Sequence, residues 1–311
     1  MSSSNTKTLA VCAYHNVGYF CLRELLRQGA RVGVVFTHED SPSEEIWFAS
    51  VQEFAERNGI PCRVTDINLP ENVAFLRSMN PDFLLSFYYR FMIRKEVLDI
   101  PQRGALNLHG SLLPKYRGRV PVNWAVINGE TETGATLHYM VEKPDAGDIV
   151  DQERIPIEFT DTSLDVFNKV TDAAVCMLSR SWPLLLSGKA QRIPMDLSKG
   201  SYFGGRKPAD GLIDWKRGAV EIYNLIRGVT HPYPGAFSYL NGSKVFIWKS
   251  RPVPGFGAEG HIVSERPLTV GTGDGLLEIM SLQIEGEEEL NDESFTSLYP
   301  LVGKRFESFL S

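Results

Sequence analysis

Short apolar runs alternate with amphipathic segments between residues 8 and 109, and this alternation constrains the fold more than any other feature of the sequence. Residues 17–29 place apolar side chains at helical spacing and end at Gly29, which is typical of a helix. Residues 44–59 predict a second helix that ends at Gly59. Strands separated by helices are typical of a parallel sheet, so we predict an α/β domain with a Rossmann-like parallel sheet. The predicted strands are residues 8–14 (TLAVCAY), 31–37 (RVGVVFT), 61–65 (PCRVT), 83–88 (FLLSFY) and 105–109 (ALNLH).

The pattern of apolar and turn-forming residues changes at about residue 205. Five short apolar runs separated by Gly, Pro and Asn turns follow one helical stretch, which predicts a small antiparallel, OB-like β-barrel. A chain of 311 residues also exceeds what one compact core usually holds. We therefore predict two domains, residues 1–204 and 205–311, with the linker near 188–208. Before it, residues 134–141 and 149–157 predict a pair of strands, and residues 162–188 predict a long helix that closes the first domain.

Composition limits the partners and the cellular compartment that we expect for the protein. The formal net charge of −6 gives no general attraction to phosphate polymers, so binding to nucleic acid would need a local basic patch. No apolar run approaches the ~20 residues of a membrane span, and the N-terminus lacks an apolar signal core. The four cysteines stand far apart without a CxxC pair, which predicts buried free thiols. We expect a soluble cytoplasmic protein, and its oligomeric state stays open, a homo-oligomer included.

Residues 107–121 (NLHGSLLPKYRGRVP) carry the strongest chemical signal. Alternate side chains of a strand share one face, so Asn107 and His109 should project together while the two leucines between and before them face the core. An amide can donate an N–H to an oxyanion, and an imidazole can carry a proton. A pair of ordinary strand-end polar groups is the alternative. The cationic loop that follows, and Asp145 on a turn between two strands, favour catalysis, because a carboxylate beside His109 would hold its tautomer and favour its charged form.

Other motifs are informative mainly by what they lack. The loop AYHNVG after the first strand has no GxGxxG or Walker pattern, which disfavours a dinucleotide or nucleoside-triphosphate site. The histidines show no metal-ligand spacing, so we predict no metal site, and we interpret His138 as an ordinary strand residue. Lys115, Arg117 and Arg119 form either a solvated loop or a contact with phosphate or carboxylate.

The run 105–150 resembles the folate-dependent formyltransferases, which share N-x-H, then S-L-L-P with a basic loop, then D-x-G. More narrowly, AYHNVG, FTHEDSP, SFYYR and HGSLLPKYRGR resemble the transformylase domains of the bifunctional lipid A modification enzymes, which N-formylate UDP-4-amino-4-deoxy-L-arabinose. The likeness extends to FGGRKPADGLIDW and HPYPGAFSY in the second domain, and so covers essentially the full chain.

The resemblance implies a role for particular residues. Asn107 would stabilise the tetrahedral oxyanion, His109 would act as general acid and base, and Asp145 would favour the charged form of His109. The peptide bond between Leu113 and Pro114 would be cis. The co-substrate 10-formyltetrahydrofolate would contact Phe91, Met92 and Ile93 mainly through their backbone groups. The residues that would complete this pocket are Arg119, Val141, Glu142, Lys143, Pro144 and Asp145.

A nucleotide-linked sugar needs a second set of contacts. Basic side chains can neutralise its diphosphate and an aromatic ring can stack on its base. The residues predicted for these contacts are Lys115, Arg117, Arg206, Lys207 and Tyr233. Phe237 is the alternative stacking ring, and a solvated linker is the alternative for Arg206 and Lys207.

Three functions stay open at this stage. The first is an N-formyltransferase for a nucleotide-linked amino sugar, such as UDP-4-amino-4-deoxy-L-arabinose. The second is a methionyl-tRNA formyltransferase, which is disfavoured because residues 206–311 hold 11 Lys and Arg against 14 Asp and Glu, whereas phosphate contacts need a basic face. The third is an inactive folate or nucleotide sensor, which would not need Asn107, His109 and Asp145 together.

Overall fold

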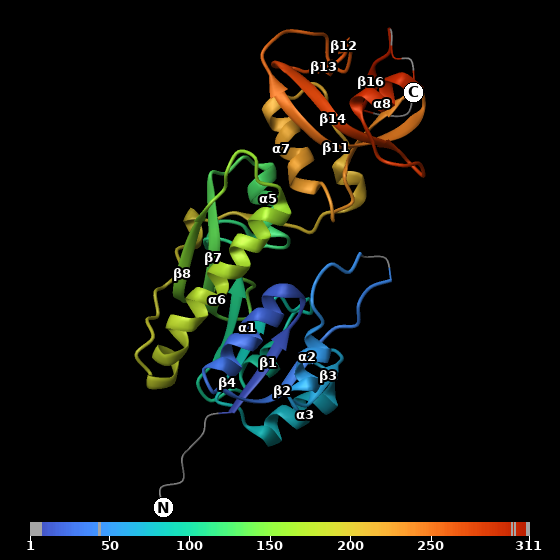
Figure 1. The fold of residues 1–311 in the computed structure, drawn as a ribbon. Helices are drawn as coiled ribbons and strands as arrows, with labels where there is room; N and C mark the ends of the chain where they lie inside the picture. The colour runs from blue at the N-terminus through green and yellow to red at the C-terminus, as the bar shows by residue number, and fades with distance from the viewer. Residues whose placement is uncertain (1–7, 43–44, 300, 302, 309–311) are drawn as a thin grey trace, which may run out of the picture. The chain divides into compact units, whose positions relative to one another are not determined.

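The computed structural model describes residues 8–42, 45–299, 301 and 303–308, and the chain divides into two compact units (Figure 1). The first unit runs to Pro121 and adds Glu132–Pro156 and Phe167–Phe203. The second unit contains Val122–Thr131, Ile157–Val166 and the part of the chain from Gly204 onward. Two short segments of the stretch predicted as one domain therefore pack with the C-terminal part, and the boundary at residues 204 and 205 stays a prediction.

A seven-stranded sheet forms the centre of the first unit. Its strand order is β3-β2-β1-β4-β5-β7-β8. The first five strands pair in parallel, and β7 and β8 continue the sheet in antiparallel pairing. All of the predicted strands are present to within two residues, so the predicted α/β class is confirmed. The strands are β1 (Thr8–Ala13), β2 (Arg31–Thr37), β3 (Cys62–Val64), β4 (Phe83–Phe87), β5 (Ala105–His109), β7 (Glu132–Tyr139) and β8 (Ile149–Pro156).

Helices α1 to α5 lie between these strands along the chain, and α6 follows the last of them. They are α1 (His15–Arg27), α2 (Val51–Arg57), α3 (Pro70–Met79), α4 (Lys95–Leu98), α5 (Pro121–Ile127) and α6 (Ser163–Ser187). Helix α3 was not predicted, although Pro70 in its first turn is a helix-start signal.

The predicted start of the second helix is wrong. Helix α2 begins at Val51, because the Ser50 hydroxyl caps it by accepting a hydrogen bond from the Glu53 N–H at 3.2 Å. The aromatic rings of Trp47 and Phe48, which the sequence suggested as part of the helix, pack instead around His15 at 4.4 and 4.0 Å between ring centroids. Residue 44 lies outside the described residues.

The second unit is built on a curled antiparallel sheet, which confirms the predicted barrel-like domain. Its strand order is β12-β13-β14-β11-β10-β16, and a bridge between His261 and Arg305 links the two ends of this order. Helix α7 and the inward faces of the strands share one apolar core that includes Trp215, Ile247 and Phe295. The elements are α7 (Ala219–Val229), β10 (Ala236–Leu240), β11 (Ser243–Val253), β12 (Ile262–Glu265), β13 (Leu268–Gly271), β14 (Leu276–Ile284), β15 (Leu290–Asn291), α8 (Asp292–Leu298) and β16 (Phe306–Glu307).

Two sequence expectations concern the chain as a whole. All four cysteines are free, as predicted, but Cys62 is only half-buried and Cys176 is exposed, so the prediction of burial fails for these two. Among the residues described, none of the helices combines the length and apolar character required to cross a membrane.

Candidate active site

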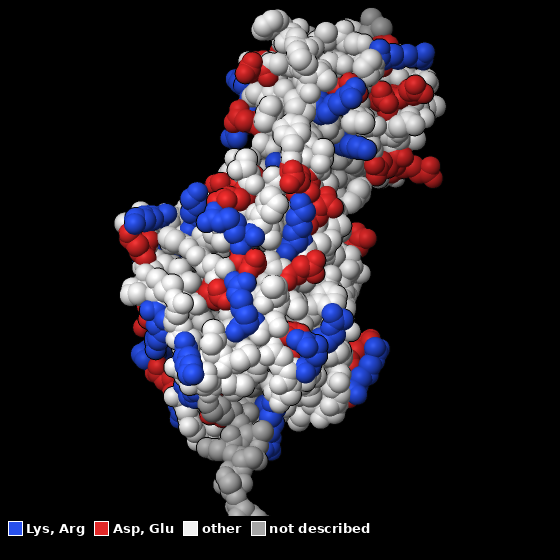
Figure 2. Space-filling view, turned by 60° about the vertical axis from the view of Figure 1, so that its left-hand side comes forward, with Lys and Arg blue, Asp and Glu red and all other residues white. Residues whose placement is uncertain are grey.

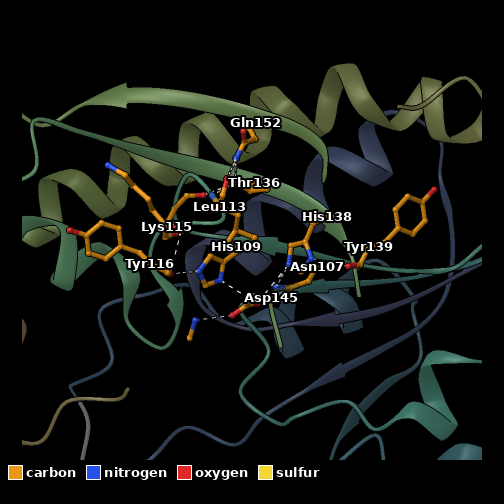
Figure 3. A network of polar contacts seen from close by, with 12 residues as sticks. Asn107, His109, Leu113, Lys115, Tyr116, Thr136, His138, Tyr139, Asp145 and Gln152 are labelled. Carbon is orange, nitrogen blue, oxygen red and sulfur yellow. Dashed lines mark hydrogen bonds and ion pairs between the residues drawn. The ribbon is translucent and has the colours of Figure 1, made fainter. Parts of the chain in front are cut away.

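Four polar side chains converge at the carboxyl end of β5 (Figure 3). Asn107 and His109 project from β5, His138 comes from the neighbouring strand β7, and Asp145 lies on the turn between β7 and β8. β5 lies between β4 and β7 in the sheet, so its end is enclosed and the leucines that flank Asn107 are buried. The structure therefore brings together the three residues predicted for catalysis and adds one that was not predicted.

His109 is held at both ring nitrogens. Its Nε2 lies 2.7 Å from the Tyr116 carbonyl oxygen, and since a carbonyl only accepts hydrogen bonds, Nε2 carries a proton and donates it. Its Nδ1 lies 3.6 Å from Oδ1 of Asp145. The imidazole is 6% exposed, so both contacts are made in a largely water-free setting.

Asp145 is fixed by the backbone around it. Its Oδ2 accepts a hydrogen bond from the Gly118 N–H at 2.9 Å, and its own φ of 48° lies in the left-handed region. Two residues on, a Cβ at Gly147 would collide with the Tyr139 carbonyl oxygen, so the turn has to be made by glycine. This close approach gives a physical reason for the D-x-G pattern.

The loop after His109 is held by the segment that leads out of the first unit. Strand β6 (Arg117–Gly118) pairs in parallel with β9 (Tyr202–Phe203), and the Tyr116 N–H donates to the Ser201 hydroxyl at 2.9 Å. The Tyr116 ring stacks on Phe203 with 5.0 Å between ring centroids. The loop supplies the Tyr116 carbonyl to His109 and the Gly118 N–H to Asp145, so residues 201–203 support both partners. Sequence analysis placed residues 201–203 in the linker region and did not predict these contacts.

The peptide bond between Leu113 and Pro114 is cis, as the resemblance predicted. In the same loop, the Leu113 N–H donates to the Thr136 hydroxyl at 3.1 Å, and Gln152 donates to the Leu113 carbonyl at 2.8 Å. The loop is thus attached to β7 and β8 as well as to the outgoing segment.

His138 lies on strand β7, as interpreted from the sequence, and its side chain is part of the polar group at this site. It lies opposite Asn107 in the register of β5 and β7, and it is 1% exposed. Its Nε2 is 3.3 Å from Nδ2 of Asn107 and 3.7 Å from Oδ1 of Asp145. Burial lowers the pKa of His138 to about 4, and this effect exceeds the opposing one of Asp145. The ring is therefore neutral at physiological pH.

The residues predicted for the folate pocket differ in their exposure to solvent. Phe91 and Met92 are exposed, whereas Ile93 is buried and joins the core beneath the sheet. Asn68, which sequence analysis missed, fixes this segment: its side chain donates to the Met92 carbonyl at 2.8 Å and accepts from the Arg94 N–H at 2.9 Å.

The remaining residues of that prediction lie along the surface of the site. Arg119 is exposed, as are the first three residues of the 141–145 segment, while the last two are half-buried. These five residues are Val141, Glu142, Lys143, Pro144 and Asp145.

An aromatic cluster lies around Phe91, at the carboxyl ends of β2 and β4. His38 stacks on Tyr89 at 4.4 Å between centroids and contacts Phe91 at 4.6 Å. Burial, with a smaller effect of Arg90, lowers the pKa of His38 to about 4, and the neutral Nε2 accepts the Arg90 N–H at 2.8 Å. The aromatic density of residues 87–91 was the signal that could have predicted this cluster.

The residues predicted for the nucleotide sugar are divided between the two units. Lys115 is exposed and Arg117 is half-buried in the first unit. In the second unit the Arg206 guanidinium lies over the Trp124 ring at 4.7 Å and donates to the Asp210 carbonyl at 2.8 Å. Lys207 is exposed.

Tyr233, the predicted stacking residue, is held within the second unit. It is partly buried against the core of the barrel, and burial raises its pKa to about 12. Its ring is therefore engaged in packing within the described structure.

Within the described ranges, no three His, Cys, Asp or Glu side chains are grouped so that they could hold a metal ion. The chemistry available at this site is that of an amide donor, an imidazole that carries a proton, and a carboxylate. Such a set suits acyl transfer, in which an oxyanion develops and a proton moves.

The family of the chain follows from its sequence. Residues 22–181 match the family described as "Formyl transferase", and residues 206–300 match "Formyl transferase, C-terminal domain". The chain therefore belongs to the formyl transferase family, and it is an enzyme of that class.

Solved structures show the same fold. WlaRD, described as a sugar 3N-formyl transferase in the presence of dTDP and 5-N-formyl-THF, aligns with a TM-score of 0.70 at 21% identity over 92% of this chain and 100% of its own. An N-formyltransferase from Helicobacter canadensis, in complex with folinic acid and dTDP-3-aminofucose, gives 0.69 at 20% identity over 91% and 100%. HypX from Aquifex aeolicus, in complex with tetrahydrofolic acid, gives 0.64 at 18% identity over 94% of this chain and 47% of its own.

Proposed function

We propose that this protein transfers a formyl group from 10-formyltetrahydrofolate to the amine of a nucleotide-linked amino sugar. The observation that carries the proposal is the grouping of Asn107, His109 and Asp145 at the end of β5 in a chain of the formyl transferase family. The named ligands of the similar structures, a formyl folate with dTDP and folinic acid with a dTDP-sugar, support the two substrate classes.

The reaction makes two demands on the protein. A bond forms between the amine nitrogen and the formyl carbon, the bond from that carbon to the folate nitrogen breaks, and a proton passes from the amine to the departing nitrogen. Asn107 would donate an N–H to the oxygen that becomes negative, which is worth roughly 3–4 kcal/mol for a typical oxyanion donor. His109 would move the proton, and Asp145 would face the imidazole while it is charged.

The binding residues belong to the proposal as well. Folate would contact the exposed segment Phe91–Met92 with the adjoining Ile93, together with Arg119 and residues 141–145. The diphosphate and base of the second substrate would contact Lys115, Arg117, Arg206, Lys207 and Tyr233. A cytoplasmic location agrees with these substrates.

The proposed acceptor has a general and a specific part. The general part is the substrate class, a nucleotide-linked amino sugar. Within it, UDP-4-amino-4-deoxy-L-arabinose, and with it lipid A modification, is the finer proposal, supported by the motifs SFYYR and HGSLLPKYRGR. The named sugar of one similar structure is a dTDP-linked 3-amino sugar, so the position of the amine and the base both need to be tested.

The charge of the second unit supports a small acceptor over tRNA. Figure 2 shows Lys and Arg interspersed with Asp and Glu on the visible face, without a broad basic patch. A tRNA-binding surface would concentrate positive charge.

The test is a formylation assay with 10-formyltetrahydrofolate and a panel of acceptors. The panel contains UDP-, dTDP- and GDP-linked sugars that carry the amine at position 3 or 4, with methionyl-tRNA as the control. We expect formylation of at least one nucleotide sugar, with UDP-4-amino-4-deoxy-L-arabinose the best of them. Formylation of methionyl-tRNA alone would overturn the proposed acceptor class.

A further inference from the structure

His138 is the buried titratable group nearest to Asn107 that the proposed mechanism does not use. It lies directly across the β5–β7 pair from Asn107, and the exposed fraction of its side chain is 1%. The ring cannot turn away to solvent, so its two nitrogens have to be satisfied by the groups around it.

The proton on His138 is placed by its backbone contact. Nδ1 lies 2.8 Å from the carbonyl oxygen of Tyr139, which can only accept, so Nδ1 carries the proton. In the neutral ring Nε2 is then an acceptor, and it points at Nδ2 of Asn107 from 3.3 Å.

This contact decides which way the Asn107 carboxamide points. The oxygen and nitrogen of a carboxamide exchange places when it rotates by half a turn, and the two orientations have almost the same shape. An acceptor at Nε2 of His138 favours the orientation with NH₂ toward the ring, because the other would set the amide oxygen against a lone pair. The second N–H of the same NH₂ group then stays available to the substrate.

The groups that face His138 show why its ring has to remain neutral. Asp145, from the β7–β8 turn, and His109, from β5, both face His138. A protonated Nε2 would turn its N–H toward Oδ1 of Asp145, which is 3.7 Å away, and Asn107 would lose its acceptor.

We propose that His138 is a positioning residue, which fixes the Asn107 carboxamide so that an N–H and not the amide oxygen faces the developing oxyanion. The inference rests on the proposed function, and in particular on Asn107 as the oxyanion donor. His138 itself need not touch either substrate.

The first test is a double-mutant cycle measured with the best acceptor of the panel. His138→Leu removes the acceptor, and we expect kcat to fall about tenfold while KM for both substrates stays nearly constant, since loss of a whole oxyanion donor costs roughly 100- to 1000-fold. His138→Gln, whose amide oxygen can accept from Asn107, is the matched control and should keep most of the activity. In an Asn107→Ala background, His138→Leu should have no further effect on kcat.

The outcomes separate this inference from the proposed function. A wild-type enzyme that formylates no acceptor would contradict the proposed function. An active wild-type enzyme in which His138→Leu lowers kcat equally with and without Asn107, or not at all, would overturn the positioning role alone.

A second measurement covers the case in which His138→Leu fails to fold. Long-range proton–nitrogen correlation spectra of the wild-type protein report the tautomer of each histidine, and His138→Gln identifies the signal of His138 by its loss. We expect a neutral ring with the proton on Nδ1 at pH 7. A proton on Nε2, or a charged ring, would overturn the inference.

Discussion

The residues proposed for catalysis and those proposed for ligand contact differ in how firmly the chain itself holds them. His109 and Asp145 contact each other and the loop 116–118, which residues 201–203 support in turn, and Asp145 also faces a histidine of β7. Met92, Lys115 and Arg119, in contrast, are exposed. Donors for an oxyanion have to be oriented before the reaction starts, whereas side chains that bind a substrate can become ordered when it arrives. Substitutions in the first group should therefore act on kcat and those in the second on KM.

The largest effects are expected for His109→Ala and, equally, for Asn107→Ala. Loss of a general acid and base should lower kcat at least about 100-fold, because no imidazole would be left to carry the proton from the amine to the departing folate nitrogen. Steady-state kinetics with the best acceptor measures this, and the affinity for folate should change little. A variant that keeps its kcat and loses only affinity would make His109 a ligand.

Asp145→Asn should have the next largest effect. The amide can still accept the Gly118 N–H through its oxygen, so the turn is kept while the negative charge facing His109 is lost. We expect kcat to fall about tenfold or more with an unchanged melting temperature. A kcat equal to that of the wild type would show that the charge of Asp145 has no part in the reaction.

Gly118→Ala tests whether the outgoing segment supports the site. Gly118 has a φ of 99°, and a Cβ there would collide with the Phe203 carbonyl oxygen, so the β6–β9 pair has to shift. If the strain of a Cβ at this position adds roughly 1 kcal/mol to the activation free energy of formyl transfer, kcat should fall about fivefold. Gly204→Ala is the matched control, since a Cβ there meets nothing within 4 Å. Equal activity of the two variants would separate this segment from catalysis.

The smallest effect is expected for Arg206→Ala. If the guanidinium binds the diphosphate, KM for the nucleotide sugar should rise roughly three- to tenfold with kcat nearly unchanged. Its contacts with Trp124 and Asp210 could also be structural, so Arg206→Lys, which keeps the charge without the planar stack, is measured beside it. A KM that stays constant for every nucleotide sugar would remove Arg206 from the substrate site.

The sequence predicted those parts of the structure that depend on short-range patterns. Asn107 and His109 share a face because side chains alternate along a strand, and the apolar runs marked the sheet itself. The start of α2 was predicted too early because apolar residues at helical spacing extend back beyond Trp47. The pair Ser50 and Glu53 is a helix-start signal that could have placed the start correctly.

The parts that were missed depend on pairings between distant segments. His138 meets Asn107 only through the register of β5 and β7, and no local pattern around His138 encodes that register. Residues 201–203 reach the loop through a two-residue parallel pairing, which is too short to leave a periodic signal. The placement of the folate and sugar residues depends on ligands, and these assignments stay predictions.

We propose that Asn107 acts on the chemical step, and single-turnover kinetics of Asn107→Ala measure that step separately from binding. Enzyme in excess over 10-formyltetrahydrofolate and saturating acceptor gives the rate of formyl transfer, and equilibrium titration of the same variant gives its folate affinity. We predict a rate at least about 100-fold below that of the wild type, with a dissociation constant for folate that is nearly unchanged. A wild-type rate at saturation combined with weakened folate binding would contradict it.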